Sequence, residues 1–240
     1  MPASEPPRRV LLIGNSRWHW GESADGRLWR HWDGEAVADP PVPDGWAAVG
    51  PQPSIAADEL WRQRQLTNRD VPLAALPDHV GIDRALAAWG AWTQARGPVM
   101  VVDAGTALTL TVVDAQGRFL GGRIQAGADL QLQALHRGTR QLPLASLRDA
   151  TSVGEPWPRD TEAALRTGVA EGLASAVTGA WVQRPGDHGA VPPWSLWLTG
   201  GDGPCLEPLL QRRGLIVRHV PGLALDAMAR LAGFTPVRDP

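Results

Sequence analysis

The stretch Val99–Asp114 constrains the fold of this 240-residue chain more than any other. Two runs rich in β-branched residues flank the corner Asp103-Ala104-Gly105-Thr106, which predicts a strand, a sharp turn and a returning strand. The corner offers a carboxylate, a hydroxyl and a glycine whose bare backbone lets a ligand approach closely. These groups suit a phosphate and its cation, because amides and hydroxyls bind oxyanions while a carboxylate binds the cation. An ordinary hairpin with a turn aspartate explains this stretch equally well.

A second corner of the same kind lies near the N-terminus. The apolar run Val10–Ile13 is followed by the small polar segment Gly14–Ser16, and Trp18–Trp20 is expected to begin a returning strand. Each half of the chain therefore opens with a hairpin whose corner can face a phosphate. Strand and helix patterns alternate in the early part of the chain, which favours an α/β fold.

The boundary between two lobes is predicted from the residues that end a helix in the middle of the chain. A helix from Gly81 to Arg96 buries Ile82, Leu86 and Trp89, and Arg96–Pro98 ends it. We therefore expect an N-terminal lobe over 1–97 and a C-terminal lobe over 98–240. Further strands are predicted around 26–32, 45–50, 119–127, 194–198 and 215–220, and further helices around 56–65, 128–140, 160–181, 204–213 and 223–231.

Composition excludes several classes of function. The net charge is −2 and no basic tract is present, which argues against binding to nucleic acid or to an anionic membrane. No apolar run approaches membrane-spanning length, and the N-terminus lacks a signal peptide. The lone Cys205 supports neither an internal disulfide nor a cysteine-based metal site. A soluble cytoplasmic protein is expected, and most of the 12 Trp residues are expected to pack a β-rich first lobe rather than to stack on bases.

Two further segments carry polar groups at element ends. Asp83 and Arg84 lie in the first turn of the predicted helix, where an acid also has the purely structural role of favouring the helix dipole. The turn Thr199–Gly203 leads from a strand to a helix, and a nucleoside can lie against the backbone of Gly200 and Gly201. A plain connection between the two elements remains the alternative for this turn.

Five short motifs, taken in chain order, resemble those of type III pantothenate kinases. The resemblance extends from about Val10 to Leu231. The motifs are Gly14-Asn15-Ser16, Gly81-Ile82-Asp83-Arg84, Asp103-Ala104-Gly105-Thr106-Ala107, Gly121-Gly122-x-Ile124 and Thr199-Gly200-Gly201-Asp202. The resemblance implies an α/β fold with two related ribonuclease H-like lobes of the acetate/sugar kinase–Hsp70–actin superfamily, separated by a cleft.

The resemblance also implies an activity, namely the phosphorylation of pantothenate by ATP with Mg²⁺ and a monovalent cation, K⁺ or NH₄⁺. It implies a homodimer, for which the Gly- and Ala-rich face of the Thr161–Trp181 helix is the expected contact. The implied roles are Asp83 as proton acceptor, Gly81, Ile82, Asp83, Arg84 and Thr161 as pantothenate contacts, Gly14, Asn15, Ser16, Arg17 and Thr106 as ATP contacts, and Asp103 as ligand of the monovalent cation.

Three departures from the family pattern qualify this expectation. Leu12 stands where the family has an Asp that helps to hold Mg²⁺, the chain has no Tyr for the pantothenate pocket, and Ala126 stands where Pro is common. Two alternatives therefore stay open. One is a regulatory or accessory protein that has lost activity, since the family includes proteins first described as Bvg accessory factors. The other is a kinase of the same superfamily with a different small acceptor.

Overall fold

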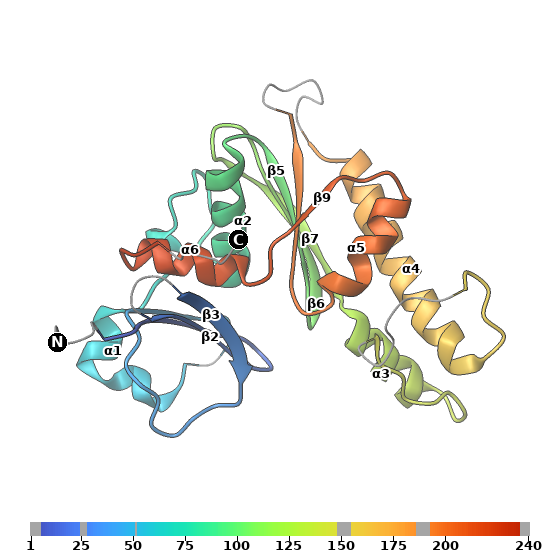
Figure 1. Ribbon diagram of the computed structural model, residues 1–240, viewed down its shortest axis with the longest axis horizontal. Helices are drawn as coiled ribbons and strands as arrows, with labels where there is room; N and C mark the ends of the chain where they lie inside the picture. Colours follow the sequence, from blue (N-terminus) through green and yellow to red (C-terminus); the bar gives the residue numbers. More distant parts are fainter. Residues whose placement is uncertain (1–5, 25–27, 51, 148–154, 186–192, 236–240) are drawn as a thin grey trace. The chain divides into compact units, whose positions relative to one another are not determined.

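The computed structural model describes residues 6–24, 28–50, 52–147, 155–185 and 193–235. The chain forms two compact units, each built on its own sheet (Figure 1). The first unit comprises Met1–Gln94 together with Gly222–Pro240, and the second comprises Ala95–Pro221. The division at residue 97 stays a prediction, and the C-terminal segment makes its contacts in the first unit.

The first unit contains a four-stranded sheet in the order β3-β2-β1-β4. Its strands are β1 (Arg8–Ile13), β2 (Trp18–Ala24), β3 (Leu28–Gly34) and β4 (Gly45–Ala48). The first three strands form an antiparallel meander, and β4 lies parallel to β1. The predicted first hairpin is therefore confirmed.

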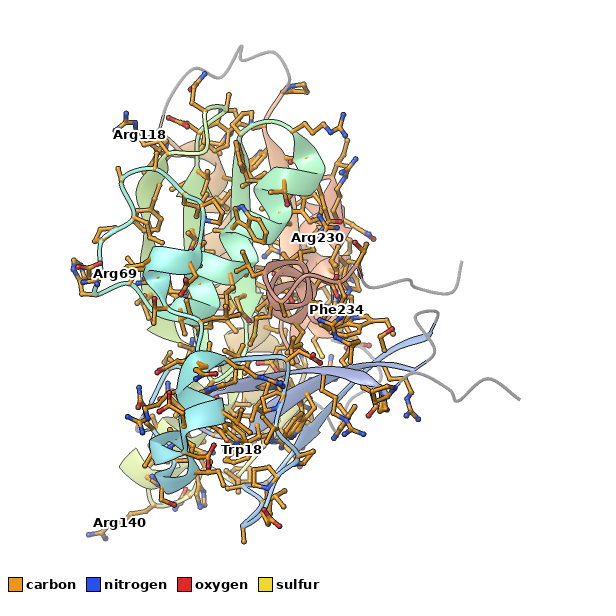
Figure 2. All side chains as sticks on the ribbon, turned by 90° about the vertical axis from the view of Figure 1, so that its left-hand side faces the viewer. Trp18, Arg69, Arg118, Arg140, Arg230 and Phe234 are labelled. Carbon is orange, nitrogen blue, oxygen red and sulfur yellow. The ribbon has the colours of Figure 1, made fainter. Side chains whose placement is uncertain are left out.

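Tryptophans form the core on one face of this sheet. Leu11 and Ile13 point to this face and pack in one cluster with Trp18, Trp20, Trp46 and Trp61. The Trp46 indole donates from Nε1 to the carbonyl oxygen of Trp61 over 2.6 Å, so its polar group is satisfied in the interior. Figure 2 labels Trp18 in this cluster. The expected packing role of these tryptophans is confirmed.

Two helices from distant parts of the sequence pack together in the first unit. They are α2 (Ile82–Ala95) and α6 (Leu223–Leu231), which lie side by side in Figure 1. Their close approach requires Gly90, because a Cβ there would lie 3.2 Å from the carbonyl oxygen of Leu223. The α6 helix is also joined to β3, since Trp29 donates from Nε1 to Asp226 over 2.8 Å. Phe234, labelled in Figure 2, follows α6 and meets the Trp29 ring edge-on.

The prediction of one helix over 56–65 is wrong, because the α-helix found there is shorter. The structure has a 3₁₀ turn η1 (Ser54–Ala57), a short α1 (Glu59–Gln63) and, further on, η2 (Asn68–Asp70). The reason lies in the sheet: Trp46 donates its backbone N–H to Arg64 and accepts from Leu66. The backbone after α1 is used for pairing along β4 and therefore cannot continue the helix.

The second unit contains a five-stranded sheet in the order β7-β6-β5-β8-β9. Its strands are β5 (Val99–Ala104), β6 (Ala107–Val113), β7 (Phe119–Ala126), β8 (Ser195–Thr199) and β9 (Val217–His219). Three helices cover one face of this sheet (Figure 1), namely α3 (Ala128–Gly138), α4 (Thr161–Val182) and α5 (Gly203–Arg212). The predicted central hairpin is confirmed, because β5 and β6 pair antiparallel from Val99↔Val113 to Ala104↔Leu108. Among the described residues, no helix is long and apolar enough to cross a bilayer.

Candidate functional site

At the corner between β5 and β6 the backbone of the turn lies very close to the backbone at the start of α3. The Gly105 amide donates to Ala107 over 3.1 Å, which closes the turn. Gly127, at the start of α3, donates to the Thr106 carbonyl oxygen over 3.0 Å, and a Cβ on Gly127 would lie 2.0 Å from the carbonyl oxygen of Gly105. Only glycine fits at this position.

The turn between β8 and α5 meets the same corner. The backbone N–H of Asp202 donates to Ala104 over 2.9 Å. Gly200 has φ +92°, and a Cβ on it would lie 2.4 Å from the Ala104 carbonyl oxygen and 2.6 Å from Oδ1 of Asp103. The structure therefore brings together Asp103, the Gly105–Thr106 turn and the glycine-rich turn at 200. The sequence singled out these segments separately and did not predict that they meet.

The corner between β1 and β2 is more open. The Gly14 amide donates to the Arg17 carbonyl oxygen over 2.9 Å, which defines the turn, and the side chains of Asn15, Ser16 and Arg17 are exposed. Oδ1 of Asn15 lies 3.1 Å from where a Cβ on Gly50 would stand, just beyond β4. The polar side chains at this corner are thus exposed at the end of the sheet.

Asp83 lies in the first turn of α2, which begins at Ile82. Its Oδ1 accepts the backbone N–H of Arg84 over 2.8 Å, and a Cβ on Gly81 would lie 2.6 Å from this oxygen. Burial raises the pKa of the Asp83 carboxyl above its ordinary value, while the Arg84 amide and guanidinium act in the opposite direction. Burial also lowers the pKa of Arg84. Ile82 lies in the core with 7% of its surface exposed, so only its backbone is positioned to contact a ligand.

His19 connects the first corner with Asp83, and it was not among the residues predicted from the sequence. Its Nε2 lies 3.0 Å from where a Cβ on Gly14 would stand, and a positive charge on its ring acts to lower the pKa of Asp83. Its Nδ1 lies 2.7 Å from Oδ1 of Asp33. The sequence alone does not single out His19, because it is one residue of a predicted strand. Only the pairing of β2 with β1 and β3 places it beside Leu12 and Asp33.

Thr161 is exposed at the first turn of α4. This helix begins there because the Asp160 side chain accepts the backbone N–H of Ala163 over 2.9 Å and caps the first turn. Thr161 lies in the second unit, whereas Asp83 and Arg84 lie in the first.

The residues present suit a metal ion that arrives together with ATP. Among the described residues, no three His, Cys, Asp or Glu side chains gather into a preformed metal site. Mg²⁺ in kinases is held largely by the substrate phosphates and by water. Asp103, at the end of β5, supplies a carboxylate for a cation at this corner. Leu12 is buried and offers no oxygen ligand.

Comparison with known proteins gives a consistent result. The model of a family described as type III pantothenate kinase matches residues 57–183. A protein of Synechococcus elongatus named type III pantothenate kinase is 38% identical over 246 residues, covering 94% of this chain and 96% of its own.

Solved structures show the same fold at much lower identity. A Baf family protein of Campylobacter jejuni is 18% identical with a TM-score of 0.54, covering 93% of this chain and 96% of its own. A 2-dehydro-3-deoxygalactonokinase protein of Sinorhizobium meliloti is 14% identical with a TM-score of 0.54, covering 94% and 97%. The expected α/β fold, with one sheet in each of two units, is therefore confirmed.

Proposed function

The chain belongs to the type III pantothenate kinase family, and from this premise we propose that it phosphorylates pantothenate with ATP in the first step of coenzyme A synthesis. In this reaction the hydroxyl oxygen of pantothenate forms a bond to the γ-phosphorus, the bond from that phosphorus to the β-phosphate oxygen breaks, and ADP leaves. The observation in the structure that best supports the proposal is the partly buried Asp83 carboxylate in the first turn of α2, whose pKa is raised by burial.

Asp83 is proposed as the general base. A base must have a pKa near the working pH to accept a proton effectively, and burial shifts Asp83 in that direction. The hydroxyl proton passes to the Asp83 carboxylate as the oxygen attacks. Gly81 leaves room for this carboxylate, because a side chain there would collide with Oδ1.

Arg84 and Thr161 are proposed to bind pantothenate. The guanidinium of Arg84 suits the carboxylate of this substrate, since charged donors make the stronger hydrogen bonds to carboxylates. The Thr161 hydroxyl is exposed and adds a neutral donor.

The two corners are proposed to bind ATP. Gly14 keeps the first corner free of a side chain, and Asn15, Ser16, Arg17 and Thr106 offer polar side chains to the phosphates. Gly200 and Gly201 provide a flat backbone surface for the nucleoside. Phosphoryl transfer depends mainly on positioning and charge neutralisation, which such groups supply. Mg²⁺, when bound with ATP, neutralises charge on the phosphates. Asp103 is proposed to hold the monovalent cation, K⁺ or NH₄⁺.

We further propose a homodimer that forms through α4. The small residues on one face of α4 are Thr161, Ala164, Gly168, Gly172, Ser175 and Gly179, and the first five of them are exposed. A Cβ added at Gly168, Gly172 or Gly179 would meet no atom of the described residues within 4 Å. This small-residue face allows a second helix to approach closely. The proposed location is the cytoplasm, where ATP is available.

The assay that tests the proposed function measures ADP formation by the purified protein with and without pantothenate. We expect turnover to depend on both pantothenate and K⁺, with Na⁺ as the control for ionic strength. Turnover at the same rate without pantothenate, or only with a different small alcohol, would refute the proposal.

A further inference from the structure

The β1–β2 pairing places His19 directly opposite Leu12. Residues directly opposite each other in an antiparallel pair have their side chains on the same face of the sheet. The next strand places Asp33 directly opposite His19, so Leu12, His19 and Asp33 form one row across the sheet. Leu12 contributes no polar group to this row, and His19 and Asp33 contribute an imidazole and a carboxylate.

The Asp33 carboxylate fixes the orientation of the His19 ring. Nδ1 of His19 lies 2.7 Å from Oδ1 of Asp33, so Nδ1 carries the proton of this hydrogen bond. The other ring nitrogen, Nε2, then points to the first corner, where it lies 3.0 Å from the position of a Cβ on Gly14. Nε2 acts as a donor when the ring is protonated.

The pair of His19 and Asp33 is expected to add little to the stability of the sheet. The side chains of His19 and Asp33 are 37% and 50% exposed. Exposed ion pairs contribute little to folding. The charge of His19 also acts on Asp83, which connects the row with the proposed base.

We propose that His19 is a catalytic residue which, as an imidazolium held by Asp33, donates from Nε2 to an oxygen of the γ-phosphoryl group of ATP. The inference rests on the proposed function and names the group that neutralises the transferring phosphoryl at the first corner. Charge-assisted donors aimed at the transferring group lower the barrier to phosphoryl transfer. His19 thereby supplies positive charge beside Leu12, whose side chain offers no ligand to a cation.

The test compares ligands that differ in the γ-phosphate. Affinities for ADP and for a non-hydrolysable ATP analogue are measured by calorimetry with Mg²⁺ and without pantothenate, for wild type, His19→Ala, His19→Gln and Asp33→Asn. His31→Gln is the matched control, because His31 lies on the neighbouring strand and packs against Gly222. Thermal unfolding verifies that each variant is folded.

We expect His19→Ala to bind the ATP analogue about tenfold more weakly and ADP nearly unchanged, as for the loss of one charge-assisted hydrogen bond. The kcat should fall about 10²-fold. His19→Gln, which keeps a donor without the charge, should lie between Ala and wild type, and Asp33→Asn should weaken the analogue but not ADP. A merely structural role would weaken both nucleotides equally.

Equal weakening of both nucleotides, or no change in either, overturns the inference. A wild type that binds both nucleotides but shows no pantothenate-dependent turnover refutes the proposed function instead, and the nucleotide comparison still decides the contact. A wild type that binds neither nucleotide overturns both.

Discussion

The burial of Asp83 and its proposed role as a base have opposite pH dependences. Burial makes the folded state more stable at low pH, whereas catalysis requires the ionised carboxylate. Burial favours the neutral acid, so the ionised carboxylate is held at a cost to the folded state. Because the folded pKa is raised, the stabilisation from Asp83 is complete at low pH and is lost as the pH rises through the folded pKa. Catalysis has the reverse dependence, since a general base must be ionised.

This raised pKa predicts the acid side of the pH profile. We expect kcat/KM for pantothenate to fall as the pH drops through a value above about 3.9, the ordinary pKa of Asp. The measurement is a pH series of initial rates. Full activity down to pH 4 would contradict the assignment.

A loss of activity through unfolding at acid pH must be distinguished from protonation of Asp83. The control is the unfolding temperature at each pH. Burial of Glu22 raises its pKa, but hydrogen bonds from Arg30 and Arg9 outweigh this and keep the pKa below the ordinary value. Glu22 therefore stabilises the fold above its unfolded pKa, and this contribution is lost as the pH falls through its folded pKa.

The sequence predicts which segments form strands and helices better than it predicts where these end or which distant segments they contact. Both hairpins follow from apolar runs that lead into small polar corners, because such local patterns decide strand and turn. The α1 helix is shorter than its pattern because the backbone of Arg64 and Leu66 pairs with Trp46, a contact made across the fold. The close approach of Gly200 to the corner likewise depends on a strand far away in sequence.

Substituting Gly200 tests this close approach. Gly200→Ala introduces a left-handed alanine and a methyl group that collides with Ala104 and Asp103. We expect about 1–2 kcal/mol of destabilisation from the backbone strain. The collision should add about 1–3 kcal/mol and raise the KM for ATP.

The matched control is Gly214→Ala, measured by denaturant unfolding beside Gly200→Ala. Gly214 has φ +77° and nothing within 4 Å of an added Cβ, so it carries the strain without the collision. Equal destabilisation of the two variants, with the KM for ATP unchanged, would show that the corner tolerates a side chain.

The whole molecule consists of two units, of which the first is completed by the C-terminal helix α6. The sequence gives no local sign of this return, because the contact between Gly90 and Leu223 joins residues more than a hundred positions apart. The small residues of α4 predict a dimer contact on this face, and no atom of the described residues would lie within 4 Å of a Cβ on Gly168, Gly172 or Gly179.

A charge on this face should prevent the proposed dimer. Gly172→Glu places a carboxylate where the monomer has open space, so the fold should be retained. We expect sedimentation velocity to show the 25.7 kDa monomer for this variant and a dimer for wild type. Gln116→Glu adds the same charge at an exposed turn and should remain dimeric. An unchanged dimer in Gly172→Glu would exclude this face.

In the proposed reaction Asp83 takes the proton of the pantothenate hydroxyl. Its test is the kcat of Asp83→Asn, measured with saturating ATP, pantothenate and K⁺ beside the unfolding temperature. Asparagine keeps an acceptor for the Arg84 amide and removes the buried charge, so the unfolding temperature at neutral pH should not fall. We predict a kcat at least about 10²-fold below wild type in a protein that is equally stable. A variant that turns over pantothenate at the wild-type rate would contradict the account.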